Sequence, residues 1–446
     1  MSSILIRSGI VITMNDRLEV IEGDVSIKDG RIAAVASNIT EAHDQTVDAG
    51  GGYVLPGFIQ THIHLCQTLF RGYADDLELM DWLRLRVWPM EAAHTPETLR
   101  TAAQLATTEL LCSGTTTVLT METVHDTDVV FEAVKESGMR ATIGKCMMDF
   151  DAQVPARLQE QTRASIDESL AIRKRWDGAA NGRLKAAFAP RFAVSCSREL
   201  LEAVASLSHE QDALVHTHAS ESRGEIAIVH EMTGCRSNIE YLANVHLTSR
   251  HLCAAHCVWA DDRDQQLLAE HDVKVMHCPG SNLKLGSGIA PVPEMRARGI
   301  TVSLGADGAA CNNRLDMFDE MRLAAVLQAM RAKPGVLNAR DVLWMATRAG
   351  AKTLGLDDDI GSLEVGKKAD VIVVDRDRAH MTPGPDPFST IVYAARGSDV
   401  RTTIVDGYIL VDRFTPLHID RNKIVFDARK AAEVLSNRAK IQLQLS

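Results

Sequence analysis

Two histidines one residue apart, His62 and His64, end the stretch that begins with the apolar run Pro56–Ile59. Side chains alternate between the two faces of a strand, so on a strand both imidazoles would point to the same side. Imidazole nitrogens are common ligands of zinc and of other divalent transition metals. A His-x-His pair also occurs by chance in a chain with 16 histidines. The pair therefore indicates half of a metal site, provided that the chain supplies the remaining ligands in suitable places.

From residue 57 onward, strand-like segments alternate with helix-like segments. The predicted strands are Phe58–His64, Thr115–Thr120, Ala141–Met147, Leu184–Pro190, Ala213–His218, Leu252–His256, Val273–His277 and Thr301–Asp307. The predicted helices are Glu97–Leu111, Val129–Glu136, Ala156–Arg175, Arg198–Leu207, Glu225–Met232, Asp262–Glu270, Glu294–Arg298, Phe318–Met330 and Ala339–Leu354. Eight alternations over roughly 300 residues predict an α/β fold, a (β/α)₈ TIM barrel. A doubly wound open sheet is the alternative, but no Gly-x-Gly-x-x-Gly follows the first strand.

Both ends of the chain have a different texture, with short strands and turns. The predicted terminal strands are Ile4–Ile12, Asp24–Ile27, Arg31–Val35, Ala369–Val374, Ser389–Ala394, Thr402–Val405 and Tyr408–Val411. The N-terminal strands lack partners in their own part of the chain, so we expect the two ends to pair. Residues 1–56 and 365–446 would form a small composite β-sandwich with a C-terminal helix, Asp427–Lys440. Residues 57–364 would form the barrel.

Active sites of such barrels lie at the C-terminal ends of the strands, so the polar residues there are the candidates. They are His62 and His64 on the first strand, Arg191 after the fourth, His218 on the fifth, His256 on the sixth, His277 on the seventh and Asp307 on the eighth. Three imidazoles and one carboxylate, from His62, His64, His218 and Asp307, suit one zinc or ferrous ion. His216 could replace His218 as the ligand. We prefer His218 because it stands at the strand end.

These residue types predict hydrolysis. A divalent ion with an open coordination position lowers the pKa of a bound water and supplies hydroxide near neutral pH. Asp307 could take the proton of that water, and Glu221 could deliver a proton to a ring nitrogen of the substrate. His256 could orient the hydroxide or the oxyanion. His277 either joins this site or only hydrogen-bonds the loop 279–282. The residues alone indicate attack of water on an electrophilic carbon, and no more.

Composition excludes other classes of function. The net charge is −11 and no Lys/Arg block occurs, which argues against nucleic acid as a partner. No apolar run reaches the ~18 residues of a membrane span. The nine cysteines are an odd number without a Cys-x-x-Cys pair, which is typical of reduced thiols. We expect a cytoplasmic enzyme with a small-molecule substrate and no membrane or nucleic-acid partner.

The chain resembles the amidohydrolase superfamily, in its branch of aminohydrolases with one metal ion. The resemblance is carried by Leu55–Phe58 before His62-Ile63-His64, Leu69–Gly72, His218–Glu221, Ala255–Cys257, His277–Pro279, Ser281–Gly286, Gly305–Gly308 and Gly361–Asp370. It implies a TIM barrel with a terminal β-sandwich, and a hydrolase that releases ammonia from a cyclic amidine. One divalent metal, Zn²⁺ or Fe²⁺, is implied, because no strand-end lysine suggests a bridging ligand. A homodimer or homotetramer is also implied.

The motifs also suggest a substrate class. Ser281–Val292 and Asp307–Asn313 look like enzymes that deaminate 5′-modified adenosines, namely 5′-deoxyadenosine, methylthioadenosine and S-adenosylhomocysteine. Trp82 and Glu91 match that group, in which the glutamate faces the ribose. Arg191 and Gln67 instead resemble residues that bind the purine edge in guanine deaminases. Gln67, Trp82, Glu91 and Arg191 are therefore the expected substrate contacts. A guanine, 8-oxoguanine or pterin deaminase and an s-triazine hydrolase stay as alternatives.

Overall fold

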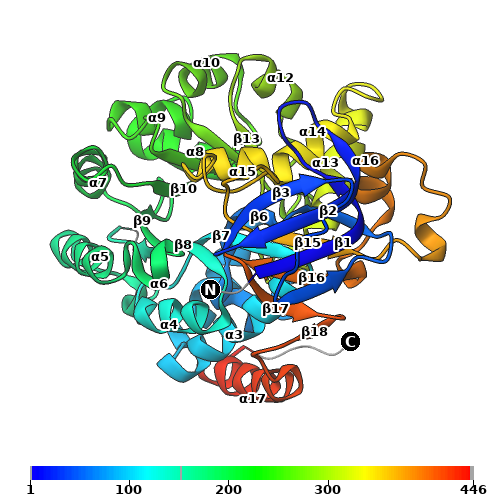
Figure 1. Ribbon diagram of the computed structural model, residues 1–446. Coiled ribbons are helices and arrows are strands. Elements are labelled where there is room, and N and C mark those ends of the chain that lie inside the picture. Colours follow the sequence, from blue (N-terminus) through cyan, green and yellow to red (C-terminus); the bar gives the residue numbers. More distant parts are fainter. Residues whose placement is uncertain (1–2, 151–152, 442–446) are drawn as a thin grey trace.

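The computed structural model describes residues 3–150 and 153–441, and in them a parallel β-barrel is the central feature (Figure 1). Its strands follow one another around the barrel in chain order. They are β6 (Phe58–His64), β7 (Thr115–Met121), β8 (Arg140–Met147), β9 (Leu184–Pro190), β10 (Val215–Ala219), β11 (Leu252–His256), β12 (Lys274–His277), β13 (Val302–Leu304) and β14 (Asp307–Gly308). The predicted barrel is confirmed, with each expected strand present within a few residues.

The barrel closes where its eighth strand divides into two short halves. β13 pairs in parallel with β12, and β14 pairs in parallel with β6. Gly305 lies between the halves, and a Cβ atom there would be 2.5 Å from the backbone oxygen of His62. Only glycine permits this close approach. The closure brings Asp307, at the end of the eighth strand, beside His62 and His64 at the end of the first.

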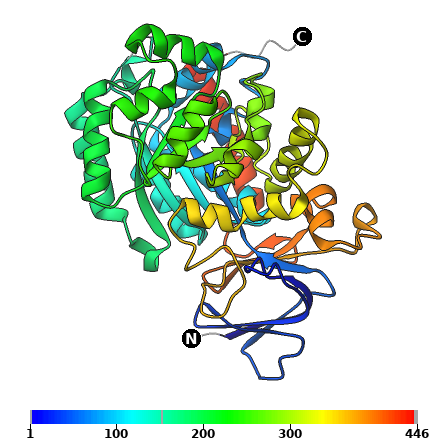
Figure 2. The same ribbon diagram turned by 90° about the horizontal axis from the view of Figure 1, so that it is seen from above.

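Helices surround the barrel (Figures 1 and 2). The main ones are α3 (Pro96–Cys112), α4 (Thr127–Ser137), α5 (Thr162–Trp176), α7 (Arg198–Glu210), α8 (Arg223–Thr233), α9 (Asn238–Asn244), α10 (Asp262–Glu270), α12 (Val292–Ala297), α13 (Met317–Arg331), α14 (Ala339–Ala346) and α15 (Arg348–Thr353). Shorter helices that the sequence did not predict follow the strand ends: η1 (Leu65–Phe70), α1 (Leu79–Trp82), η2 (Leu83–Val87), α2 (Trp88–Ala93) and α11 (Pro279–Lys284). Among the described residues, no helix is both long and apolar enough to cross a membrane.

The two ends of the chain form a second sheet beside the barrel (Figure 2). Its strands are β1 (Ser3–Ile12), β2 (Val20–Lys28), β3 (Arg31–Ala36), β4 (Gln45–Asp48), β5 (Tyr53–Pro56), β15 (Val371–Val374), β16 (Val400–Val405), β17 (Tyr408–Asp412) and β18 (Thr415–Pro416). Antiparallel pairing of β5 with β15 joins the N-terminal half to the C-terminal half. The predicted composite β unit is therefore confirmed, as one continuous sheet whose halves share a small apolar core. The exact domain limits stay a prediction.

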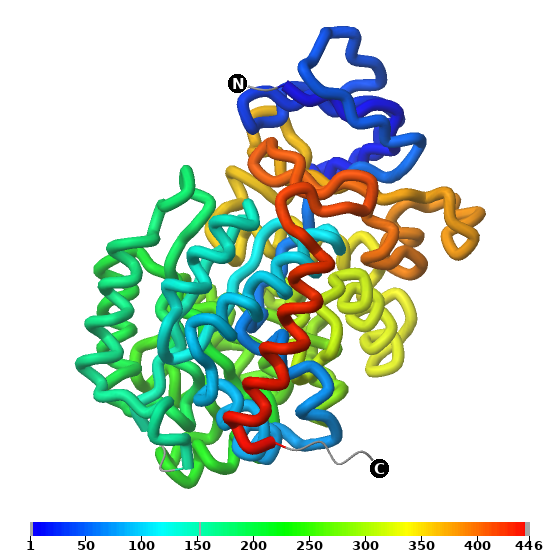
Figure 3. The backbone as a smooth tube through the Cα atoms, turned by 90° about the horizontal axis from the view of Figure 1, so that it is seen from below, coloured from blue at the N-terminus to red at the C-terminus, as the bar shows by residue number. Residues whose placement is uncertain are grey.

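The last helix, α17 (Arg421–Ala439), runs from the terminal sheet along the outside of the barrel (Figure 3). It begins earlier than predicted because the side chain of Asp420 accepts a hydrogen bond from the Lys423 backbone and caps the first turn. Near its C-terminal end, Arg438 Nε donates to the backbone oxygen of Ala93 at 2.8 Å. The helix therefore ties the short helices of the strand-end face to the rest of the chain.

One predicted strand is wrong and two predicted helices are interrupted. The predicted strand Ser389–Ala394 is instead helical, in α16 (Pro387–Ser389) and the π-helical turn η5 (Thr390–Ala394). A short buried apolar run has the same pattern in a strand and in a helix, and here Pro387 and the Asp386 cap start a helix. The predicted helix Ala156–Arg175 is interrupted, since only a short turn, η3 (Ala156–Leu158), precedes α5. The predicted helix Ala339–Leu354 breaks at Thr347 into α14 and α15.

The surroundings of His94, at the end of α2, lead to a prediction of how the stability of the protein depends on pH. Its Nε2–H donates to the Cys66 backbone oxygen at 3.1 Å, and its Nδ1 lies 3.0 Å from Thr98 Oγ1. Burial lowers the pKa of His94 from 6.5 to about 4. The unfolded chain therefore binds more protons between these two values, and stability is lost as the pH falls through that window.

Replacing His94 with Gln isolates this contribution, because the other buried histidines are common to both proteins. The wild-type advantage in unfolding free energy should shrink by about 3 kcal/mol between pH 7 and pH 4 in urea titrations. Exposed His418→Gln is the control, and its difference from wild type should stay constant. A pH-independent difference for His94→Gln would contradict the assignment.

Candidate metal centre and active site

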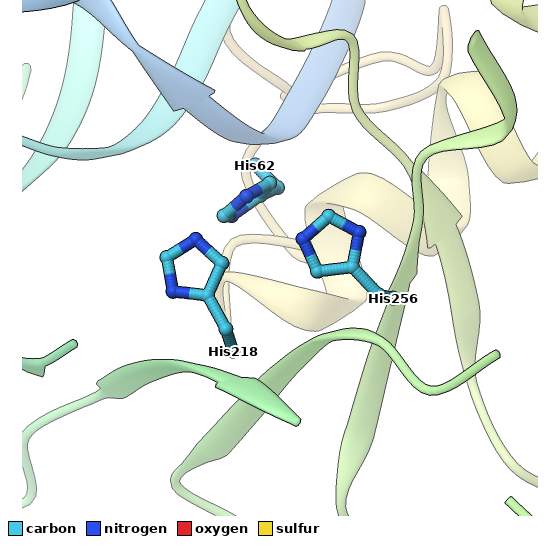
Figure 4. A group of neighbouring side chains, drawn as sticks. All are labelled: His62, His218 and His256. Atoms are coloured by element: carbon cyan, nitrogen blue, oxygen red, sulfur yellow. The ribbon is translucent and has the colours of Figure 1, made fainter. Parts of the chain in front are cut away.

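The four predicted metal ligands converge at the end of the barrel where the C-terminal ends of its strands lie. His62 Nε2 and His64 Nε2 each lie 3.3 Å from Asp307 Oδ1, and His218 Nε2 lies 3.3 Å from His64 Nε2. Ligand atoms of His62, His64 and Asp307 all lie within 4.8 Å of one another, and so do those of His62, His218 and His256. Figure 4 shows the rings of His62, His218 and His256 facing one another across this centre.

Hydrogen bonds on the outer side of the rings orient the inner nitrogens. His64 Nδ1–H donates to the Met121 backbone oxygen at 2.8 Å, and His218 Nδ1–H donates to the Arg191 backbone oxygen at 2.7 Å. Each Nε2 of these two rings is then free of a proton and presents a lone pair to the centre. His62 Nε2 is buried and makes no hydrogen bond with any described residue. These donors and the Asp307 carboxylate fit a divalent metal ion.

The charge states of these groups also suit a metal ion. Burial lowers the pKa of His62 to about 4 and that of His218 well below its usual 6.5. Both rings are therefore neutral near pH 7, as metal ligands must be. Burial opposes ionisation of Asp307, but the neighbouring His62 and His64 hold the pKa of Asp307 well below 3.8.

The three predicted catalytic groups lie beside one another. His256 Nε2 is 3.5 Å from Glu221 Oε2 and 3.9 Å from Asp307 Oδ2. Burial opposes protonation of His256, but the carboxyl groups of Glu221 and Asp307 raise its pKa, while burial raises the pKa of Glu221. The imidazole of His256 is thus placed to hold a proton between two carboxyl groups, and Glu221 is placed to keep one.

Hydrogen bonds from the surrounding loops fix this group. Ser281 Oγ–H donates to Asp307 Oδ2 at 2.6 Å, and Asn282 Oδ1 accepts from His256 Nδ1–H at 2.9 Å. Glu225 Oε2 accepts the backbone N–H of Glu221 at 2.7 Å. These contacts of Ser281, Asn282 and Glu225 were not predicted from the sequence. Glu221 lies in the loop just before α8 and Glu225 lies in the first turn of that helix, so this contact between a helix and the loop before it had no periodic signal in the sequence.

Backbone strain coincides with two of the predicted catalytic residues. His256 has φ of 70° and Asp307 has φ of 62°, in the left-handed region that residues with a side chain rarely adopt. Such conformations cost about 1 kcal/mol or more and occur most often at functional sites. The strain aims both side chains into the centre of the barrel.

Apolar residues cover the catalytic groups and form the wall of a cavity over His64, His218, Glu221 and Asp307. The covering side chains are Leu79, Trp82, Leu83, Phe192 and Leu285. Trp82 and Arg191, two of the predicted substrate contacts, are among the lining residues. Trp82 Nε1–H is buried without a hydrogen-bond partner in the described residues. The lining residues and this unpaired donor suit a largely apolar ligand with at least one hydrogen-bond acceptor.

The other two predicted contacts, Gln67 and Glu91, lie in a buried network in which Arg191 and Gln67 both donate to the Glu91 carboxylate. Arg191 Nη1 donates to Glu91 Oε2 at 2.6 Å, and Nη2 donates to Oε1 at 3.2 Å. Gln67 Nε2 donates to Glu91 Oε1 at 3.1 Å, whereas Gln67 Oε1 has no partner among the described residues. The guanidinium and the carboxylate therefore satisfy each other, and the arginine is not free to bind a purine edge while this pair is intact.

The two histidines left open by the sequence have different surroundings. His216 Nε2 lies 2.6 Å from His62 Nδ1, so His216 contacts a proposed ligand from behind and His218 faces the centre. His277 is buried, and neither ring nitrogen makes a hydrogen bond with the described residues. The suggested bond from its ring to the loop 279–282 is therefore absent. Burial lowers the pKa of His277 to about 3, so the ring is neutral.

Comparisons with known proteins agree with this arrangement. The model of the Amidohydrolase family matches residues 53–410. A 5′-deoxyadenosine deaminase of Methanosarcina acetivorans is 41% identical over 441 residues, which cover 98% of this chain and 100% of the relative. A 5-methylthioadenosine/S-adenosylhomocysteine deaminase of Thermococcus onnurineus is 41% identical over 410 residues, covering 92% and 94%.

A solved structure shows the same fold. The crystal structure of an adenosine deaminase from Xanthomonas campestris with bound zinc has a TM-score of 0.91 and 32% identity, and the match covers 97% of this chain and 98% of that one. Because the match covers nearly the whole of both chains, it extends over the barrel and over the two chain ends. This chain is therefore a member of the amidohydrolase family.

Proposed function

We propose that the protein is a metal-dependent hydrolytic deaminase that replaces the 6-amino group of a 5′-modified adenosine with oxygen and releases ammonia. The candidate substrates are 5′-deoxyadenosine, methylthioadenosine and S-adenosylhomocysteine. The observation that carries the proposal is the contact of His256 with both Glu221 and Asp307 beside the histidine cluster. The names of the relatives at about 40% identity support the substrate class.

His62, His64, His218 and Asp307 would hold the metal ion, which when bound supplies Lewis-acid activation of water. The chain's own groups then move the protons. Asp307 takes a proton from the attacking water through Oδ2, which already accepts a hydrogen bond from Ser281. Glu221, whose pKa is raised by burial, donates a proton to a ring nitrogen of the substrate. His256 orients the oxygen that adds to the ring carbon.

The apolar wall of the cavity supports a substrate with an apolar group next to the 5′ carbon. Leu79, Leu83 and Leu285 would pack against the methyl, deoxy or thioether part of such a substituent. Trp82 Nε1–H and Gln67 Oε1 are an unpaired donor and an unpaired acceptor near the site. They would meet polar atoms of the base or the sugar.

A guanine-type deaminase is the second candidate, because Arg191 lines the cavity and Gln67 contacts the same carboxylate. This function would require Arg191 to leave Glu91, with which it shares two hydrogen bonds. Breaking a buried pair of this kind costs several kcal/mol unless the ligand replaces it fully. We therefore rank the adenosine substrates first.

A substrate panel tests the proposal. Purified metal-loaded protein is incubated with the three 5′-modified adenosines, guanine, a pterin and a chloro-s-triazine, and released ammonia and chloride are measured. We expect ammonia from at least one of the adenosines, with a fall in absorbance near the adenine maximum. Turnover of guanine alone would establish the second candidate. No turnover of any adenosine would refute the first.

We further propose that the metal is zinc, that the protein acts in the cytoplasm and that it assembles as a homodimer or homotetramer. The relative of known structure contains zinc, although the same ligands suit iron. All nine cysteines are free thiols, which suits a reducing compartment. Metal analysis of the purified protein and light scattering on a sizing column measure the first and the last of these directly.

A further inference from the structure

A buried carboxyl group, that of Glu320, connects the two loops that carry the catalytic residues. Glu320 lies in the first turn of α13 and has no exposed surface. Its Oε2 accepts the backbone N–H of Gly280 at 3.0 Å, and its Oε1 accepts from Asn312 Nδ2 at 2.7 Å. Gly280 belongs to α11, which follows the seventh strand, and Asn312 belongs to the loop after the eighth strand. One side chain therefore bridges two segments that follow neighbouring strands.

On the Gly280 side, the next two residues contact the catalytic groups directly. Ser281 donates to Asp307 Oδ2 at 2.6 Å, and Asn282 accepts from His256 at 2.9 Å. Because Gly280 precedes both, the hydrogen bond from its N–H to Glu320 fixes the start of the turn that presents them. A shift of this turn would move both contacts together.

On the other side, Asn312 continues the connection to the eighth strand. The same amide nitrogen that donates to Glu320 donates to the backbone oxygen of Ala306 at 2.7 Å. Ala306 is the residue directly before Asp307. The carboxyl group of Glu320 is thus connected to Asp307 by two routes. One runs through Asn312 to Ala306, and the other runs through Gly280 to Ser281.

The packing around Glu320 leaves no room for adjustment. A Cβ atom at Gly280 would lie 2.5 Å from Glu320 Oε1 and 2.8 Å from Asn312 Nδ2, so this contact requires glycine. Glu320 is not among the residues that line the catalytic cavity. A buried carboxyl group is costly where an apolar residue would pack as well, unless its hydrogen bonds serve a purpose.

We infer that Glu320 is a positioning residue for the hydrolytic reaction, which through Gly280 and Asn312 holds Ser281, Asn282 and Asp307 in their catalytic geometry. This inference rests on the proposed function. Residues that orient catalytic groups in this way typically account for 10- to 100-fold in activity. Their loss lowers the rate of chemistry more than the binding of substrate.

The test uses the full-length, metal-loaded protein with Glu320→Ala, Glu320→Gln and Asn312→Ala. The Ala change should lower kcat about 10- to 100-fold with KM within about twofold and with unchanged metal content. The Glu320→Gln variant keeps one acceptor oxygen but turns an N–H group toward one of the two donors. Its kcat should therefore fall somewhat less than that of Glu320→Ala. Asn312→Ala removes only one side of the bridge and serves if Glu320→Ala does not fold. Asp319→Asn is the matched control, because Asp319 is in the same helical turn but pairs with Arg314.

A second readout does not depend on activity. Hydrogen exchange of peptides covering residues 278–286 and 306–313 should become at least about tenfold faster in Glu320→Ala and stay unchanged in Asp319→Asn. This arm remains informative if the wild-type protein deaminates no adenosine. Wild-type kcat in Glu320→Ala and in Asn312→Ala would overturn the inference. Loss of metal in proportion to loss of rate would also overturn it, since the role would then be in metal binding.

Discussion

Replacing Asp307 with Asn is expected to lower kcat by about 10³-fold. An amide cannot take the proton of the attacking water, and a general base typically contributes 10²- to 10⁴-fold. The amide oxygen can still accept the hydrogen bond from Ser281, so the surrounding loop should keep its place. The substitution also removes the negative charge beside His62 and His64, and metal affinity should fall.

Rates should therefore be measured with metal in excess, and the bound metal should be quantified in the same samples. Asp316→Asn is a suitable control, because Asp316 is a largely buried aspartate that only caps α13 and holds the Gly397 backbone. Its kcat should be unchanged even if its stability falls by about 1 kcal/mol. More than a tenth of the wild-type rate in metal-loaded Asp307→Asn would refute the role of Asp307 as the base.

Breaking the pair of Arg191 and Glu91 should have the largest effect on stability. Both side chains are buried, so among the described residues Arg191→Met leaves the Glu91 carboxylate with only Gln67 as a hydrogen-bond partner. Removing one member of a buried ion pair typically costs 3–5 kcal/mol, whereas replacing both can be neutral; we expect a loss of about 4 kcal/mol here. Arg191→Met combined with Glu91→Gln should accordingly recover most of the lost unfolding free energy.

Urea unfolding of the two single variants and the double variant measures this coupling. The exposed pair Arg198–Glu202 provides the comparison, and Arg198→Met should cost less than about 1 kcal/mol. If Arg191→Met also lost less unfolding free energy than the limit given for Arg198→Met, the buried pair would not be what stabilises this side of the cavity. If guanine is the true substrate, Arg191→Met should abolish its turnover while the metal stays bound.

Much of the fold followed from local patterns. The alternation of apolar strands with amphipathic helices predicted each barrel strand, because burial on both faces of a parallel strand leaves a continuous apolar run. The pattern failed for Ser389–Ala394, where a run of the same composition forms a π-helical turn. The continuous helical stretch from Leu79 to Ala93, in which η2 joins α1 to α2, was also missed, because Pro89 lies inside it and proline is disfavoured in a helix interior.

The sequence by itself determined which groups stand at the strand ends. His62 and His64 share a face because a strand has a period of two, and His218, His256 and Asp307 end their strands because the apolar runs stop there. These are properties of short segments, and they suffice to predict a hydrolytic metal site. Only the tertiary structure decided which side chains contact one another across the barrel. Arg191 and Glu91 are 100 positions apart, and Glu320 reaches Gly280 across 40. Such contacts depend on the closure of the barrel at Gly305 and on the packing of its loops, because hydrogen-bond geometry at 3 Å is set by the relative position of whole elements and not by any local pattern.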